Sequence, residues 1–156
     1  MLEKMKMIWQ DAKQLKDERG LTLVELLVVV VILGIIAAIA VVAIGGIIEN
    51  SRKDAMVSDA KQMVSAAKLY TASNPVQADT QLNFKGGTPG VDATSYMSSL
   101  KDPYSDTTYT KAIVNVKPDL TGKFTYTVEL EGSKKVIGKD AAVAESALSK
   151  ESVENK

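Results

Sequence analysis

The chain has 156 residues, so its length alone predicts one small domain. Its 19 basic and 19 acidic side chains balance, and aromatic residues make up only 5%, which argues against a basic surface that stacks nucleic-acid bases. Cysteine and histidine are both absent from the sequence, which excludes disulfides, thiolate or imidazole zinc sites and Ser-His-Asp or Cys-His catalysis. Catalysis by paired carboxylates stays open, but no pair is singled out. We therefore expect a protein that is not an enzyme and needs no cofactor.

The N-terminal part of the sequence combines a charged segment with a long apolar one. Residues 1–20 carry five Lys or Arg side chains and four acidic ones, whereas no charged residue and no proline occur from Leu26 to Ile48. These 23 positions are enough to cross a bilayer core as a helix. Because basic segments stay on the cytoplasmic side, we expect a single-pass membrane protein with a cytoplasmic leader and an outer C-terminal domain.

The helix is expected to continue beyond the apolar run. In residues 49–73 apolar side chains recur at spacings of four and three, on one helix face. The sequence Ser73-Asn74-Pro75 predicts the end, because the residue before a proline avoids helical backbone angles. The predicted helix runs from about Leu23 to Ala72. The side chains of the expected face are Met56, Ala60, Met63, Ala67 and Tyr70.

Residues 74–138 read as a small β-rich outer domain. Loop residues cluster at 86–90 and a turn is predicted at 102–106, while strands are predicted at 112–116, 124–130 and 135–137. Together they predict a small antiparallel sheet whose apolar face covers the Met56–Tyr70 helix face. Residues 139–156 are rich in Ala, Ser, Glu and Lys, and are expected to be a short helix or a partly disordered tail. The fold class predicted is α+β.

Glu25 lies at the edge of the apolar run, where an ionised carboxylate usually has a partner. If the chain is cut after Gly20, the new amine of Leu21 is positive at neutral pH. That amine can pair with Glu25 one helical turn away or on a neighbouring subunit, so cleavage would couple maturation to assembly. The alternative is a plain membrane anchor in which Glu25 reaches the membrane surface.

The sequence Gly20-Leu21-Thr22-Leu23-Val24-Glu25-Leu26-Leu27 closely resembles the class III signal of type IV prepilins and type II secretion pseudopilins. The resemblance implies that a membrane aspartic peptidase, the prepilin peptidase, cuts between Gly20 and Leu21 and N-methylates Leu21. It also implies that Glu25 is the glutamate used in assembly. The fold implied is pilin-like, with one long N-terminal helix packed on a small C-terminal sheet.

Two positions depart from the family pattern. The first mature residue is Leu21 where the family usually has phenylalanine, and Val42 stands where a proline is usual late in the apolar span. Gly45-Gly46 offers another point of local weakness, since each glycine weakens a helix by about 1 kcal/mol. Gly34 and Ala38 have the small-xxx-small spacing that lets membrane helices approach closely, although such residues are also ordinary in membrane helices.

The family resemblance implies a structural subunit of a type IV pilus or pseudopilus that serves DNA uptake, secretion, or adhesion and motility. Its implied partners are the prepilin peptidase, other copies and minor pilins in a helical filament, an inner-membrane assembly platform with its ATPase, and the lipid bilayer. Two alternatives remain open. One is a membrane-anchored binding domain that keeps its leader and never polymerises. The other is a secreted protein cut by ordinary signal peptidase near 37–40.

Two further polar clusters are candidate binding sites for calcium or DNA. Asp102 and Asp106 are a candidate calcium loop, because the segment resembles the start of the aspartate-rich calcium loop of type II pseudopilins. The later acidic cluster of that loop is missing, so a solvated turn is the favoured interpretation. Lys134, Lys135 and Lys139 make a small basic spot that could touch DNA, but the charges are too few for strong phosphate binding.

Overall fold

The computed structural model describes residues 1–14 and 22–156. Helix α1 (Leu2–Ser73) is followed by seven short strands and three 3-10 turns. The chain divides into two compact units, residues 1–47 and residues 48–156, and each is described here by itself. Because α1 begins at Leu2, the helix starts earlier than the expected Leu23; the Lys, Glu, Gln, Met and Leu residues near its start all favour helix.

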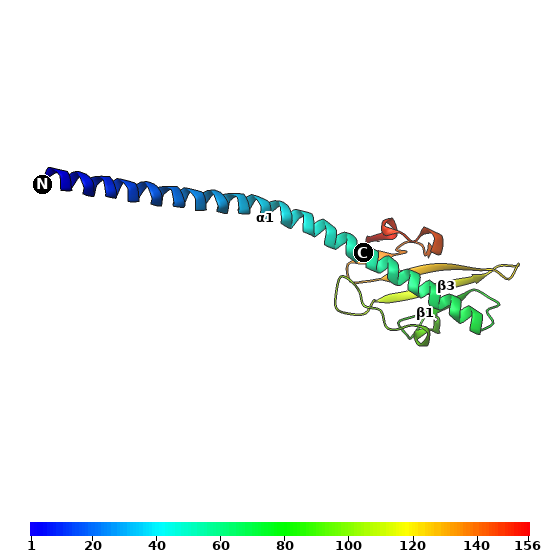
Figure 1. Cartoon of the computed structure of the whole chain (residues 1–156). Coiled ribbons are helices and arrows are strands. Elements are labelled where there is room, and N and C mark those ends of the chain that lie inside the picture. Colours follow the sequence, from blue (N-terminus) through cyan, green and yellow to red (C-terminus); the bar gives the residue numbers. More distant parts are fainter. The chain divides into compact units, whose positions relative to one another are not determined.

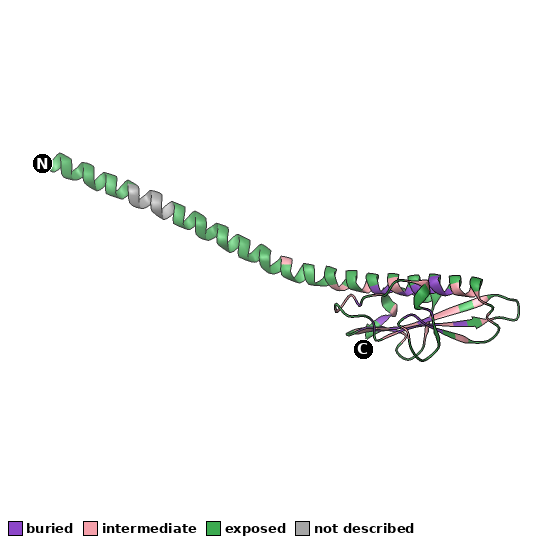
Figure 2. Ribbon diagram, turned by 90° about the horizontal axis from the view of Figure 1, so that it is seen from below, coloured by how far each residue is buried: buried purple, intermediate pink, exposed green. Residues whose placement is uncertain are grey.

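The first unit is helical and has no core of its own among its described residues. Its apolar side chains from Leu23 to Ile47 are exposed, with Ala40 partly covered (Figure 2). Valine, isoleucine, leucine and alanine fill this stretch and no proline interrupts it, so each amide can donate to a carbonyl four residues earlier.

In the second unit, the C-terminal part of α1 lies along one face of the sheet (Figure 1). Met56, Ala60, Met63 and Ala67 are fully buried and Tyr70 is partly buried, which confirms the predicted helix face. The helix ends at Ser73, as the sequence predicts. Asn74 completes that end, since its backbone N–H and side-chain Nδ2 both donate to the carbonyl of Tyr70, at 2.9 and 3.1 Å.

The sheet has the strand order β2-β1-β3-β4-β5-β7, with β6 paired to β4. All strand pairs are antiparallel except β1 with β2, so the sheet expected to be antiparallel is mixed at one edge. The three predicted strands correspond to β3, β4 and β5. The strands are β1 (Thr80–Asn83), β2 (Val91–Asp92), β3 (Lys111–Pro118), β4 (Phe124–Glu131), β5 (Lys135–Ile137), β6 (Val143–Ala144) and β7 (Val153–Asn155).

The core lies between α1 and the two long central strands. Val114 of β3 pairs with Val128 of β4, and Ala112 pairs with Leu130, so their side chains share the face toward the helix. Each fully buried aliphatic side chain here stabilises the fold by about 1.5–3 kcal/mol. The opposite face carries the ion pair of Lys111 with Glu129, together with Ile113, which is also buried. The alternation along β4 explains why that strand can be predicted from the sequence.

Residues 139–156 correct the expectation of a helix or a partly disordered tail. They form β6, the 3-10 turns η2 (Glu145–Ala147) and η3 (Lys150–Ser152), and β7, which pairs with β5. Leu148 and Val153 are buried in the core, and Lys150 pairs with Asp54 of α1 at 2.9 Å. The two buried residues are five positions apart, which matches neither helical nor strand periodicity, so no periodic pattern predicts their burial.

Candidate membrane and assembly segment

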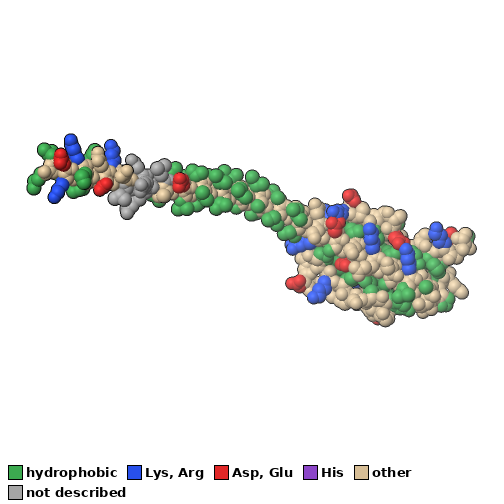
Figure 3. Space-filling model, viewed as in Figure 1, with side chains coloured by type: hydrophobic (Ala, Val, Ile, Leu, Met, Phe, Trp, Pro, Cys, Tyr) green, Lys and Arg blue, Asp and Glu red, His purple; other side chains and the backbone are tan. Residues whose placement is uncertain are grey.

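The apolar part of α1 is long enough to cross a membrane by length and composition. Apolar side chains cover its surface from Leu23 onward (Figure 3), and none of its most hydrophobic 18-residue window is buried. Transfer of each such side chain out of water stabilises by about 1.5–3 kcal/mol, so the whole segment strongly favours a bilayer or a bundle of helices over water. The segment needs a nonaqueous partner that its own unit does not supply.

Glu25 is the acidic residue at the start of this apolar surface. Its side chain is exposed, and among the described residues it makes no ion pair. The two residues of the expected cleavage site, Gly20 and Leu21, lie outside the described residues. By sequence, the amide nitrogen of Leu21 is four positions before Glu25, the spacing at which helical side chains are neighbours.

Three glycines in the span pack against nothing in the described part of the chain. A Cβ built on Gly34, Gly45 or Gly46 meets no atom within 4 Å. Glycine weakens a helix by about 1 kcal/mol relative to alanine, and here no contact among the described residues offsets that cost. With Ala38 four positions on, Gly34 forms a smooth strip suited to a neighbouring helix outside the chain. Val42 itself is 79% exposed within the continuous α1.

In the second unit, Glu49 ties the beginning of the packed helix to the sheet. Its Oε1 accepts hydrogen bonds from Nζ of Lys135 at 3.0 Å and from the hydroxyl of Tyr104 at 3.1 Å. The Lys135 contact, followed by that of Tyr104, holds the pKa of Glu49 below its ordinary value despite some desolvation. Burial and Glu49 together raise the pKa of Tyr104 to about 12. Lys53, four positions further along the helix, makes the smallest contribution to this lowering.

Asp102 acts as a hydrogen-bond acceptor that organises a turn. Its carboxylate is almost fully buried and accepts from the backbone N–H of Ser133 at 2.6 Å and of Tyr104 at 2.9 Å, and from Oγ of Ser105 at 3.2 Å. Burial raises its pKa, but these donors outweigh burial and hold the pKa below the ordinary value. Gly132 is required beside it, because a Cβ there would lie 2.9 Å from the carboxylate.

These contacts do not support a calcium site at Asp102 and Asp106. The oxygens of Asp102 face N–H and O–H donors rather than a cation, and Asp106 is exposed. Across residues 1–14 and 22–156, no group of three or more acidic side chains is placed to hold a metal ion.

Two of the three lysines in the basic cluster Lys134, Lys135 and Lys139 make contacts within the domain. Lys135 is paired with Glu49, and Nζ of Lys139 donates to the carbonyl of Asn155 at 3.2 Å. The structure therefore does not gather Lys134, Lys135 and Lys139 into a free cationic patch for DNA.

Comparison with known proteins identifies one family model. The Prokaryotic N-terminal methylation motif matches residues 15–41, which include Gly20, Leu21, Glu25 and the Gly34/Ala38 pair. No curated protein and no solved structure matches the chain. Residues 15–41 are therefore similar to the prepilin-type signal of type IV pilins and pseudopilins, and they stand at the start of an α+β chain whose long N-terminal helix packs on a small sheet.

Proposed function

We propose that this chain is a structural subunit of a type IV pilus or pseudopilus, matured by cleavage after Gly20 and polymerised through residues 21–48. The observation that carries the proposal is the juxtaposition of a methylation signal with an exposed apolar helix, whose edge holds Glu25 without a partner among residues 1–14 and 22–156. In this role residues 49–73 continue the helix into the outer domain, and residues 74–138 with 139–156 form that domain.

Cleavage would supply a cation close to Glu25. The Leu21 amine, N-methylated by the prepilin peptidase, keeps its positive charge and lies beside the start of the apolar surface. In a bundle of subunits, the Leu21 amine of one chain and Glu25 of its neighbour would pair in a low-dielectric setting, where removal of either partner is costly. Charge neutralisation would thus set the register in which helices pack along the Gly34/Ala38 strip.

The same apolar helix would lie first in the membrane and later in the core of the filament. The span first anchors the precursor with its leader in the cytoplasm and its domain outside. Because transfer of the apolar surface to water would be unfavourable, the subunit must pass from lipid directly into the helix bundle. That passage requires an inner-membrane platform with an ATPase, and it brings the subunit alongside other copies and minor pilins. DNA uptake, secretion and adhesion or motility are all compatible with such a filament.

The test is an assembly assay with a matched carboxylate control. Glu25→Ala removes the proposed partner of the new amine, whereas Glu3→Ala changes a carboxylate within the leader. We expect Glu25→Ala to be matured and retained in membranes but to lower the filaments recovered from cells by at least about tenfold, and Glu3→Ala to leave them unchanged. Normal filament recovery with Glu25→Ala would refute the role of Glu25.

A membrane-anchored binding domain that does not polymerise is the alternative. It shares the exposed span and predicts an uncleaved leader and no filaments. The packing-free glycines Gly34 and Gly45 favour polymerisation, since a lone anchor gains nothing from a smooth helix strip.

A further inference from the structure

The turn between β3 and β4 presents an unusually exposed leucine. Leu120 is fully exposed, and the turn around it is well organised. The carboxylate of Asp119 accepts the backbone N–H of Leu120 at 2.6 Å and Oγ of Thr121 at 3.1 Å, and Gly122 takes the positive φ that closes the turn. Polar residues usually fill such turns, and nothing in the turn requires an aliphatic side chain at this position. Leu120 is thus held outward on a rigid support.

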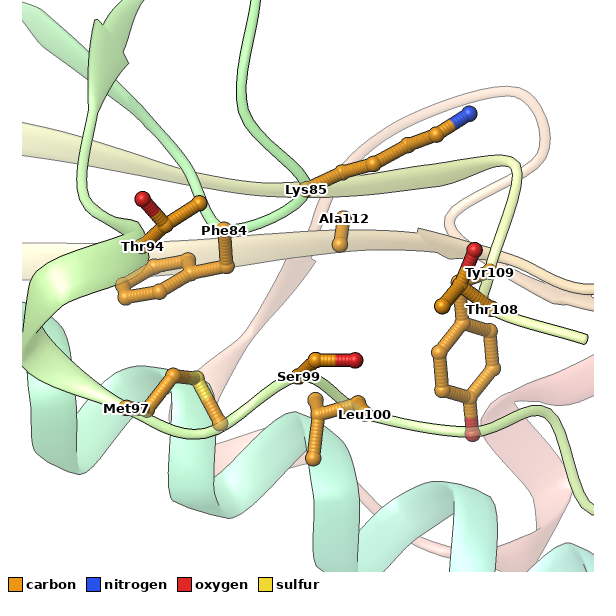
Figure 4. Close-up of a pocket in the computed structure, with 9 residues that line it drawn as sticks. All are labelled: Phe84, Lys85, Thr94, Met97, Ser99, Leu100, Thr108, Tyr109 and Ala112. Carbon is orange, nitrogen blue, oxygen red and sulfur yellow. The ribbon is translucent and has the colours of Figure 1, made fainter.

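A pocket of matching character lies elsewhere on the same domain. It has a volume of about 260 Å³ and lies between the strand side, where Phe84 and Ala112 point inward, and the irregular segment that carries Met97 and Leu100 (Figure 4). Phe84 and Ala112 are themselves buried, so the inner wall is fixed and apolar. A cavity of about 150 Å³ with apolar walls accommodates benzene, so this pocket has room for the four-carbon side chain of a leucine.

Leu120 does not fill the pocket of its own chain. Its hairpin end lies near the C-terminal end of α1, where the hydroxyls of Tyr126 and Thr71 are 2.9 Å apart. The pocket lies beside Tyr109, whose hydroxyl reaches Asp59, three helical turns earlier. A projecting apolar side chain and a pocket on different parts of one molecule make a head-to-tail contact between copies, which continues as an open helical array rather than a closed dimer.

Charges beside the two features are complementary. Asp119 supports the turn of Leu120, and Lys85 lies at the pocket with its Nζ on the carbonyl of Thr110 at 3.1 Å. Neither side chain has an ion pair within the described part of the chain. Insertion of Leu120 would bring an acidic group toward a basic one, which favours one orientation of docking.

We propose that Leu120 of one subunit inserts into the pocket formed by Phe84, Met97, Leu100 and Ala112 of the next subunit along the filament. This inference rests on the proposed function, because it assigns the contact between outer domains in the same polymer. It adds a specific outer contact to the bundle of N-terminal helices.

Cysteine cross-linking in filaments tests the contact, since the natural chain has no cysteine. Thr121→Cys removes one hydrogen bond to Asp119 but retains Leu120 and its own backbone bond to Asp119, and Ser99→Cys lies at the pocket. Filaments of the doubly substituted full-length chain should therefore give disulfide-linked dimers and longer ladders on mild oxidation. A second pair, Thr121→Cys with Thr108→Cys, places the cysteine on another wall of the pocket. It replaces the first pair if the first variant assembles poorly. Thr121→Cys with Ser146→Cys is the control, and it should not cross-link.

Adding Leu120→Ser to the first pair should lower the cross-linked fraction about tenfold, because the buried leucine supplies the affinity. Filaments that form normally with neither cysteine pair cross-linked would overturn this contact while leaving the proposed function intact. Cross-linking that is unaffected by Leu120→Ser would also overturn it. Absence of filaments from the natural chain would instead overturn the proposed function, and this inference with it.

Discussion

The hydroxyl of Tyr109 donates a hydrogen bond to Oδ2 of Asp59 at 2.7 Å, and this contact joins the segment before β3 to helix α1. Tyr109 is almost fully buried, whereas Asp59 is partly exposed. Burial raises the pKa of Asp59, and the hydrogen bond from Tyr109 opposes that rise. Burial, followed by the nearby Asp59, raises the pKa of Tyr109. The bond therefore offsets part of the cost of placing a carboxylate beside the core.

Removing this hydroxyl should destabilise the domain without opening a cavity. Tyr109→Phe keeps the ring and loses a bond to a charged acceptor, which is worth about 1–2 kcal/mol after allowance for the partial exposure of Asp59. Denaturant unfolding of the detergent-solubilised full chain, followed by circular dichroism, measures the loss. Tyr126→Phe, which loses a bond to the neutral hydroxyl of Thr71, is the control and should cost less. Equal costs would show that the charge of Asp59 does not matter.

The same pair predicts a pH dependence. Because the folded-state pKa of Asp59 is raised above 3.8, the folded protein holds this proton more tightly than the unfolded chain does. Its contribution to stability is therefore greatest at low pH and falls as pH rises from about 3.8 through the raised value. Tyr109→Phe removes the bond that lowers this pKa, so the fall should be larger in the variant. Parallel stability curves for the two proteins between pH 4 and neutrality, a range set by that shift, would contradict the assignment.

Glu49 should have the opposite pH dependence. Its folded-state pKa lies below 4.5, so its contribution is complete above that pH and is lost as pH falls through the lowered value. The side chain is about 40% exposed, so the stabilisation is below about 1 kcal/mol. Relative to the intrinsic exchange rate at each pH, the protection of the amides near Glu49 against hydrogen exchange should fall on acidification in the natural chain. In Glu49→Gln this protection should already be low at neutral pH, while Glu154→Gln should behave like the natural chain.

The helix face that covers the sheet should tolerate little truncation. Met63 is fully buried, so Met63→Ala should lower the free energy of unfolding by about 2–5 kcal/mol through lost burial and the cavity left behind. Its neighbour Gln62 is exposed, and Gln62→Ala should change stability by less than about 0.5 kcal/mol. Thermal and denaturant unfolding of both variants distinguish a core role for Met63 from a merely helical one.

The turn at Asp102 should be insensitive to calcium and sensitive to the loss of its acceptor. Asp102→Ala leaves the N–H of Ser133 without its carboxylate partner and should cost about 2–3 kcal/mol. Added calcium should leave the unfolding midpoint of the natural chain unchanged, because the oxygens of Asp102 are already engaged. A midpoint that rises with millimolar calcium and no longer does so in Asp102→Ala would restore the calcium reading.

The sequence predicts the parts of this fold that repeat regularly. The Met56–Tyr70 face follows helical spacing and β4 alternates strictly, so both were predicted correctly. The two-residue strands β2 and β6 are too short to show a period, and the three-residue strand β7 directly follows the 3-10 turn η3. Tertiary pairing, rather than local preference, makes these segments strands.

The motif around Gly20 and Glu25 can be recognised from the sequence, because it is defined by the order of neighbouring residues. The ring of contacts around Glu49 was not, since its partners Tyr104 and Lys135 are 55 and 86 positions away along the chain. Such contacts depend on how the sheet packs against the helix, and no local sequence pattern predicts that packing.

The most direct test of the central claim is N-terminal mass spectrometry of the protein isolated from cells with and without the prepilin peptidase. The proposal predicts a mature chain that begins with N-methylated Leu21 when the peptidase is present and an uncleaved leader when it is deleted. A chain from peptidase-containing cells that begins at Met1, or one that begins deep in the apolar run near 37–40, would contradict it.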